Sequence, residues 1–329
     1  MRLTATENNT TSRASVVERL LENDPGLIKL DLSSSLRIAD FAEFQRAMLA
    51  NTTVQKVVVD FQWLEEFLSK EDYLQLLSTV GQMKGLEKLM IFDHGRQPIS
   101  MEALVSAMRP AVNLKALDVV RLEFSSMHDV IVFAEVMTQK AVLERFSSHR
   151  LTLAKGVTLD PLFRALKTLP NLRAVCLSFD WDLRESYVSE ADALVTLCQS
   201  ESLQELKLWS RQLDDSCCVA IARALSVNKT LKTLDLQCQI IGNEGLEEIT
   251  KMMESNYTIE SVRTTGRRMS LTSKIDMYVK LNRAGRIILV KEHATKSDWV
   301  DVLINNHDDM DAIFYFIRSN PLILDEVTH

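Results

Sequence analysis

Residues 231–258 read LKTLDLQCQIIGNEGLEEITKMMESNYT and hold one complete structural unit. Apolar and polar residues alternate through Leu234 and Leu236, which predicts a strand. The glycine-bounded residues 242–245 predict a turn. Beyond the turn, apolar residues recur at helical spacing, namely Leu246, Ile249, Met252 and Met253. The unit is therefore a strand followed by a helix, and Asn256 closes it.

The opening pattern of this unit, L-x-x-L-x-L, recurs nine times along the chain. The copies begin at Leu27, Val54, Leu86, Leu114, Leu143, Leu172, Leu203, Leu231 and Ile259. Successive starts are separated by 27, 32, 28, 29, 29, 31, 28 and 28 residues. One strand and one helix cannot bury their apolar faces alone, so this recurrence predicts a stacked solenoid of the α/β class. Strands pair at about 4.8 Å and helices at about 8–10 Å, which bends the solenoid with a parallel sheet on its concave side.

These residues resemble the ribonuclease-inhibitor-like class of leucine-rich repeats, the class that also forms the ligand-sensing region of many NLR-type immune receptors. The pattern matches best from Leu203 to Asn256, and the resemblance covers residues 27–266. It implies a horseshoe-like scaffold that binds another protein on its concave face. Ser148 and Thr264 stand where the pattern has Leu, so we predict that their two strands are the weakest in the sheet.

The ends of a solenoid expose its core and need caps. We expect a disordered tail over 1–14, a helical cap over 15–26 that opens with a capping box, the repeats over 27–270, and a helical cap over 271–329. Residues 274–286 resemble a terminal segment that follows such repeats in many diatom proteins. The inward residues of this second cap are predicted to be Leu281, Trp299, Ile313 and Phe316.

Composition indicates a soluble, reduced protein. The net charge of −7 disfavours a nucleic-acid partner. The apolar runs are too short to span a bilayer, and no export signal is recognisable, so we expect a cytoplasmic monomer without membrane contact. Five cysteines, an odd number, favour free thiols. The N-x-T sequons at Asn51, Asn228 and Asn256 close three repeats at the same place, which favours a structural role over glycosylation.

Strand periodicity assigns a direction to each repeat position. Positions four and six point into the core, and positions three, five and seven point out. The outward positive residues are Lys29, Lys56, Lys88, Arg145, Lys207 and Arg263, and the negative ones are Asp31, Asp60, Asp118, Glu205 and Asp235. The six positive and five negative residues give this face a net charge of +1. Mixed signs suit a protein partner and provide no phosphate-tracking stripe.

Phe92 and Trp209 stand at the outward seventh position. We predict that they anchor the partner; the alternative is that they cover neighbouring aliphatic side chains. Four other aromatics occupy the eighth and tenth positions and are predicted to be core: Phe61, Trp63, Phe179 and Trp181.

A basic cluster can be assembled from Arg121, Arg145, His149 and Arg150. It could hold an acidic loop or a phosphate. The alternative is a solvated rim that Asp118 and Glu144 balance. The predicted partner-binding residues are Arg121, Arg145 and His149 from this cluster, together with Asp118, Lys207, Phe92 and Trp209.

No motif for catalysis, metal or cofactor binding is recognisable, so we expect none of the three. Small-GTPase activators of the Ran type share the repeat class, but they carry an acidic tail that this chain lacks. A substrate arm of a ubiquitin ligase and a sensor component of a larger complex remain alternatives. Residues 267–270, with Arg267, Arg268 and Ser270, match a basophilic kinase site, in which phosphate would favour the helix start that follows.

Overall fold

A computed structural model of the protein describes residues 15–33, 40–93, 98–179, 190–210, 214–238, 241–264 and 269–321. It divides into two compact units, Met1–Leu203 and Gln204–His329. Each unit alternates strands and helices, and its strands pair in parallel. The predicted α/β repeat fold is therefore confirmed.

The N-terminal unit contains the first six repeats. Its strands are β1 (Lys29–Leu32), β2 (Lys56–Asp60), β3 (Lys88–Phe92), β4 (Ala116–Val120), β5 (Glu123–Phe124), β6 (Arg145–Leu153) and β7 (Ala174–Phe179). They pair in the order β1-β2-β3-β4-β6-β7, and the short β5 pairs with β6. Its helices are α1 (Val16–Leu21), α2 (Phe41–Ala50), α3 (Phe61–Phe67), α4 (Lys70–Gln82), α5 (Met101–Met108), α6 (Met127–Thr138), α7 (Asp160–Lys167) and α8 (Glu190–Cys198).

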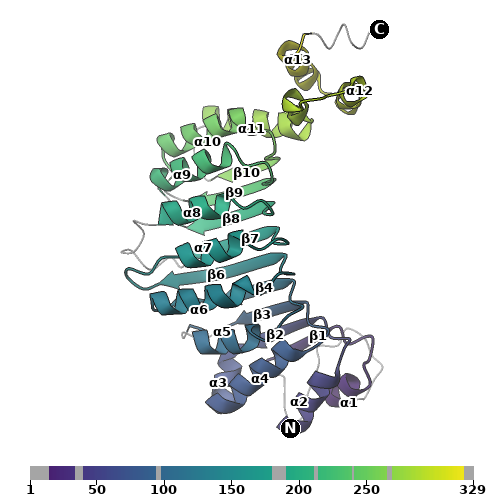
Figure 1. The fold of residues 1–329 in the computed structure, drawn as a ribbon, viewed down its shortest axis with the longest axis vertical. Helices are drawn as coiled ribbons and strands as arrows, with labels where there is room; N and C mark the ends of the chain where they lie inside the picture. Colours follow the sequence, from purple (N-terminus) through teal and green to yellow (C-terminus); the bar gives the residue numbers. More distant parts are fainter. Residues whose placement is uncertain are drawn as a thin grey trace. The chain divides into compact units, whose positions relative to one another are not determined.

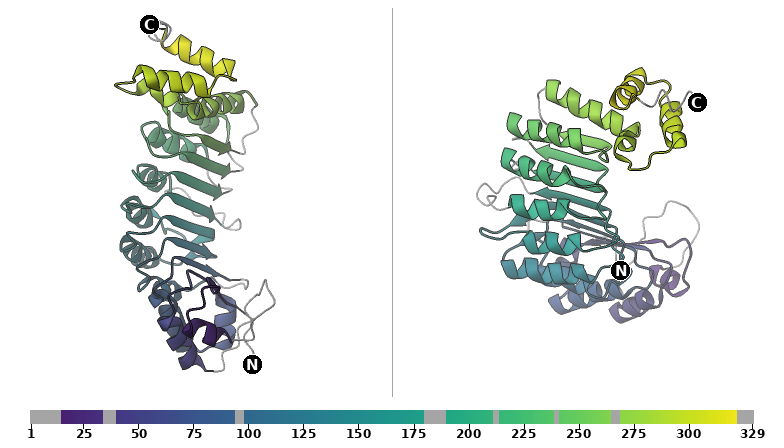
Figure 2. Two further views of the ribbon diagram at one scale, coloured as in Figure 1. Left: turned by 90° about the vertical axis from the view of Figure 1, so that its right-hand side faces the viewer. Right: turned by 45° about the horizontal axis from the view of Figure 1, so that its top comes forward.

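Helices α5 to α8 cover one face of this sheet (Figures 1 and 2). Among the described residues of the N-terminal unit, no helix covers the opposite face of strands β3 to β7. The side chains that point away from the helices are therefore the ones available to another molecule.

The C-terminal unit contains the last three repeats and a group of helices. Its strands β8 (Glu205–Ser210), β9 (Thr233–Cys238) and β10 (Ser261–Thr264) pair in that order. Its helices are α9 (Asp215–Leu225), α10 (Asn243–Ser255), α11 (Met269–Arg283), the 3-10 helix η1 (Arg286–Val290), α12 (Lys296–Asn305) and α13 (Met310–Ser319). Gly285 ends α11 with a φ of 96°, a conformation that favours glycine, as the sequence predicts.

The predicted strand directions are confirmed in β4, whereas Asp235, predicted to point out from its strand, is buried. In β4, Leu117 and Val119 are buried, while Asp118 and Val120 are only partly covered. The predicted weakness of the strand with Ser148 stays a prediction, and this strand, β6, extends over nine residues. Parallel backbone bonding to β4, β5 and β7 holds it, and Phe146, Leu151 and Leu153 bury its inner side.

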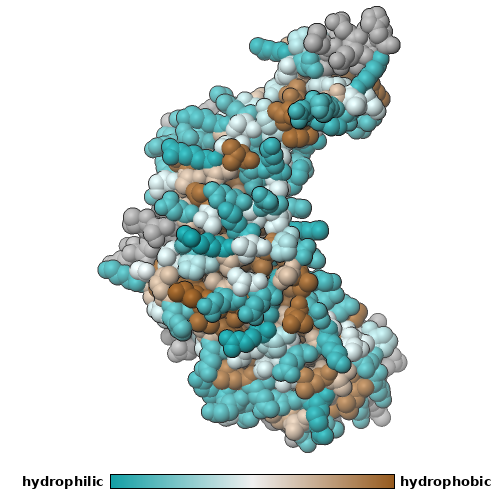
Figure 3. Space-filling view, viewed as in Figure 1, coloured by the Kyte–Doolittle hydropathy of each residue, from teal (hydrophilic) through white to brown (hydrophobic). Residues whose placement is uncertain are grey.

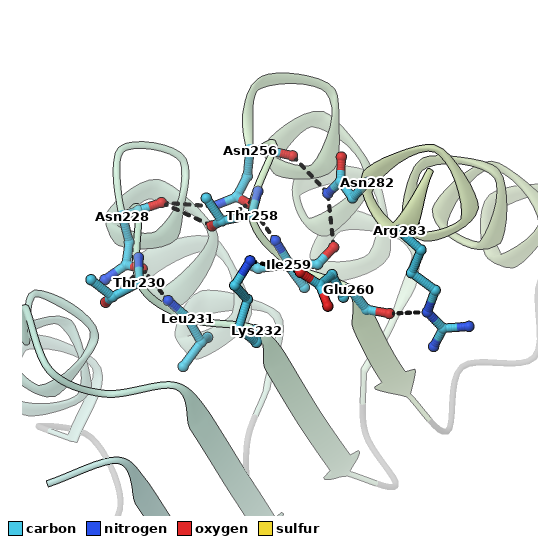
Figure 4. A network of polar contacts seen from close by, with 10 residues as sticks. All are labelled: Asn228, Thr230, Leu231, Lys232, Asn256, Thr258, Ile259, Glu260, Asn282 and Arg283. Carbon is cyan, nitrogen blue, oxygen red and sulfur yellow. Dashed lines mark hydrogen bonds and ion pairs between the residues drawn. The ribbon is translucent and has the colours of Figure 1, made fainter. Parts of the chain in front are cut away.

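Asparagines close the repeats by bonding to the backbone. Asn256 lies buried and donates from Nδ2 to the carbonyl oxygens of Leu225 at 2.7 Å and Asn228 at 3.0 Å, and its Oδ1 accepts from the Ile259 amide at 2.9 Å (Figure 4). Asn51 is buried in the same way and donates to Leu20 at 3.0 Å. These contacts support the structural interpretation of the sequons.

The repeat that begins at Val54 is the longest because it has two helices. Asp60 caps the additional helix α3, whose first turn brings Phe61 and Trp63 into the core. Phe179, at the end of β7, is also buried. The core prediction thus holds for these three aromatics, and Trp181 lies outside the described residues.

The C-terminal helices have a small apolar cluster of their own. Leu281, Trp299 and Phe316 are buried in it, as predicted. Ile313 is only half-buried, because the inward face of α13 runs through Ala312 and Phe316, four residues apart. The segment predicted as the disordered tail, 1–14, and residues 267 and 268 of the kinase motif lie outside the described residues.

Candidate protein-binding face

The face of strands β2, β3, β4 and β6 that points away from the helices is built from three rows of side chains, and Val58 and Ser147 on it are buried. The row at position three aligns Lys56, Lys88, Ala116 and Arg145. The row at position five aligns Val58, Met90, Asp118 and Ser147. The row at position seven contains Phe92 on β3 and pairs Val120 with His149. We call these residues the candidate face.

Asp118 lies at the centre of the candidate face. Its Oδ1 atom lies 3.7 Å from His149 Nε2. Burial raises the pKa of the Asp118 carboxyl, and the positive charge of His149 opposes this shift. Lys56 and Arg145 also lower the pKa of Asp118, so three basic groups from the two strands β2 and β6 surround this one carboxylate. The signs alternate here, as the sequence predicts.

The predicted basic cluster lies where the sheet changes its register. Arg121 and Arg150 both occupy position eight of their repeats and have positive φ values of 66° and 57°. The segment with Arg150 contributes one extra residue to β6, since Ser148 pairs with Leu177 but Leu151 already pairs with Phe179. The amide of Arg121 donates to the carbonyl of His149 at 2.7 Å. The structure thus joins Arg121, His149 and Asp118 through β4 and β6.

The other two predicted partner-binding residues belong to the C-terminal unit. Trp209 is half-exposed at position seven of β8, as predicted, and Lys207 forms an ion pair with Glu205 on the same strand. Lys207 aligns with Asp235 and Asp235 with Arg263. Asp235 is buried, and its nearest basic atom is Arg263 Nη1 at 4.0 Å. The view in Figure 3 shows hydrophilic and hydrophobic residues interspersed on the drawn side of each unit.

Sequence reasoning missed two polar features at the start of the strands. Glu87 and Lys115, both at position two, form an ion pair at 2.7 Å beside a hollow of about 340 Å³. Lys140 occupies the place of the closing asparagine and is buried, and its Nζ donates to the carbonyl oxygens of Arg109 at 3.2 Å and Ala111 at 3.0 Å. Counting back three residues from Leu143 would have identified Lys140.

The described residues contain few groups that could bind a metal ion or react with a substrate. They contain no cluster of three or more His, Cys, Asp or Glu side chains that could hold a metal ion. Cys176, Cys198, Cys217 and Cys218 are buried free thiols. In the described part of the chain, no helix is long and apolar enough to cross a membrane.

Neither known family models nor curated proteins match this chain. Among solved structures, it is similar to actin-binding site 2 of leiomodin-1, with 13% identity over 82% of this chain and 88% of that one, at a TM-score of 0.23. It is also similar to TLR13 in complex with ssRNA13, with 12% identity, 76% and 38% coverage and a TM-score of 0.42. The C-terminal domain of tropomodulin from Caenorhabditis elegans shows 12% identity, 81% and 90% coverage and a TM-score of 0.20. These similarities are weak, and the repeat fold rests on the chain's own strands and helices.

Proposed function

We propose that this chain is a non-catalytic scaffold that binds another protein on the candidate face. The observation that carries the proposal is the group of Lys56, Arg145 and His149, from β2 and β6, around Asp118 on β4. Strand pairing fixes the backbone beneath these side chains, so association orders little of the chain. A partner with complementary alternating charges would be oriented by this group, since such patterns favour specificity and rapid encounter.

The aromatic side chains supply a second part of the proposal. Phe92 and Trp209 each stand at position seven of a strand and are partly buried. Aromatic anchors of this kind dominate many interfaces, so Phe92→Ala and Trp209→Ala should each weaken binding by about 2 kcal/mol or more. A loss of folding stability with unchanged affinity would assign both rings to the core instead.

A charge reversal tests the proposal directly. Arg145→Glu combined with His149→Glu should abolish capture of the partner in a pull-down, because it places three acidic groups together. Arg164→Glu is the matched control, since Arg164 lies on helix α7 and its side chain is largely exposed. Thermal melts should show that all variants fold. Equal capture by the variant and the control would contradict the proposal.

The proposal also includes the particular class of leucine-rich repeat and the absence of catalytic activity. The strand pattern and the asparagine contacts support assignment to the ribonuclease-inhibitor-like repeats. The Ran-type alternative predicts that the chain accelerates GTP hydrolysis by a small GTPase. Acceleration in such an assay would overturn the non-catalytic scaffold, whereas an unchanged rate is expected.

A further inference from the structure

Helix α13 has two apolar faces, and only one of them is covered. Ala312 and Phe316 pack into the cluster with Trp299. Met310 and Phe314 instead remain 71% and 65% exposed, and Ile317 is partly exposed. These three residues recur at intervals of four and three, so they form one stripe along the helix.

Two residues of opposite charge lie along one flank of this stripe, at nearly equal distances from its central residue. Asp311 lies in the first turn and Arg318 in the last turn of α13, and both are exposed. At 100° per residue they lie within about 20° of each other around the helix, on the same flank of the stripe. Their midpoint falls between Phe314 and Tyr315. A half-turn about an axis at Phe314 therefore places Asp311 of one helix opposite Arg318 of an identical helix.

We propose that the exposed face of α13 binds the α13 of a second copy of this chain, in an antiparallel and two-fold symmetric pair. The stripe of Met310, Phe314 and Ile317 would cover its own counterpart, and two Asp311–Arg318 ion pairs would fix the direction. Such an interface uses the same patch on both copies, which is the commonest symmetry of homodimers. Antiparallel pairing follows from the charges, since a parallel two-fold pair would place Asp311 and Arg318 at different heights on opposite flanks, where they cannot form ion pairs.

The size of the exposed face of α13 sets the expected affinity of the dimer. A helix of ten residues is about 15 Å long. One such pair buries less than the roughly 800 Å² per partner of a standard interface. We therefore expect a reversible dimer with a dissociation constant on the order of tens of micromolar. The neighbouring carboxylates Asp308 and Asp311 disfavour an anionic membrane as the occupant of this face.

Sedimentation of the full chain over a concentration series tests the dimer. The wild-type protein should shift from monomer to dimer between about 1 and 200 µM, as mass action requires. Phe314→Asp should remain monomeric throughout. Phe67→Asp is the matched control, because Phe67 is a similarly exposed phenylalanine, at 62%, on helix α3. It should dimerise like the wild type.

Charge exchange distinguishes this geometry from other contacts. Asp311→Arg alone and Arg318→Asp alone should each weaken the dimer about tenfold or more, because each sets like charges together twice. A mixture of the two variants should form a heterodimer with both ion pairs restored. Helical content measured by circular dichroism shows that α13 is retained in each variant.

A wild-type chain that is monomeric at about 200 µM would overturn the proposal. It would also be overturned by a dimer that Phe314→Asp leaves intact, or by a mixture of the charge variants that fails to associate. Binding of wild type but not Phe314→Asp to anionic vesicles, without dimerisation, would assign the face to a lipid surface and would equally reject the homodimer.

Discussion

Asn282 on α11 donates its side-chain amide to the carbonyl of Asn256 at 3.1 Å, and Asn256 donates in turn to the carbonyl of Asn228 at 3.0 Å. Each asparagine makes a second bond of the same kind, to Ile259 at 2.8 Å and to Leu225 at 2.7 Å, respectively. The contact that closes each repeat therefore continues into the first helix beyond the last strand (Figure 4). Helix α11 is bonded to the repeats as though it were the helix of another repeat.

Asn282→Ala should lower the free energy of unfolding by about 1–3 kcal/mol, because it removes two buried hydrogen bonds, although the Asn256 carbonyl keeps a bond from Arg286 Nη2 at 2.6 Å. Urea unfolding measures this loss. Asn113→Ala is the control, since Asn113 makes a comparable bond to the Lys84 carbonyl at 3.1 Å but at an exposed position. Equal losses for both variants would show that the closing contact has no special role.

Trp63→Ala should destabilise the protein by about 3–5 kcal/mol, the usual range for an aromatic truncation in a packed core. Trp63 is buried, and its ring centroid lies 6.0 Å from that of Phe67, which is exposed on the same helix. Phe67→Ala should therefore cost less than about 1 kcal/mol. The two unfolding curves measure the difference, and similar costs would contradict the assignment of Trp63 to the core.

Lys140 should make stability depend on alkaline pH. Burial lowers the pKa of Lys140. Between this lowered pKa and the unfolded value of about 10.4, the unfolded chain binds more protons, so stability rises as the pH rises through that window.

Lys140→Asn should remove this rise and still supply an amide donor, as Asn256 does at the same repeat position. The measurement is the free energy of unfolding against pH, taken as wild type minus variant. Lys155→Asn, at an exposed position, is the control. A difference that stays flat with pH for Lys140→Asn would contradict the buried charge.

Two buried thiols should make the folding stability fall, rather than rise, as the pH increases. Burial raises the pKa of Cys198 to about 12 and that of Cys217 to about 11. Their unfolded thiols ionise near pH 8.5, so their stabilising contribution is complete below that pH and is lost as the pH rises through the folded values. Cys198→Ala should reduce the alkaline loss of stability, measured by urea unfolding under reducing conditions. A loss of the same steepness in both proteins would refute this assignment.

The repeat positions made much of the fold predictable. Leu117 and Val119 obey a period of two that fixes which side of a strand is buried, and Asn51 and Asn256 recur at a fixed distance before the next strand. The contacts of Lys140 could not be foreseen from residue type, because a lysine replaces an amide that makes the same backbone bonds. The length of β6 depends on the positive φ of Arg150, which periodicity does not encode.

The candidate face was predictable only in part. Asp118 and Arg145 were assigned outward by counting along their strands, and the structure places them there. The approach of His149 to Asp118 depends on the pairing of β4 with β6, which the repeat spacing alone leaves undetermined.

Site-specific photo-crosslinking tests the central claim most directly. A photoreactive residue at position 90 lies on the candidate face beside Asp118, whereas one at position 131 lies exposed on helix α6. We predict that the partner is crosslinked from position 90, that it is not crosslinked from position 131, and that Arg145→Glu abolishes the product. Crosslinking from position 131 alone, or equally from both positions, would contradict the proposal that the exposed strand face binds the partner.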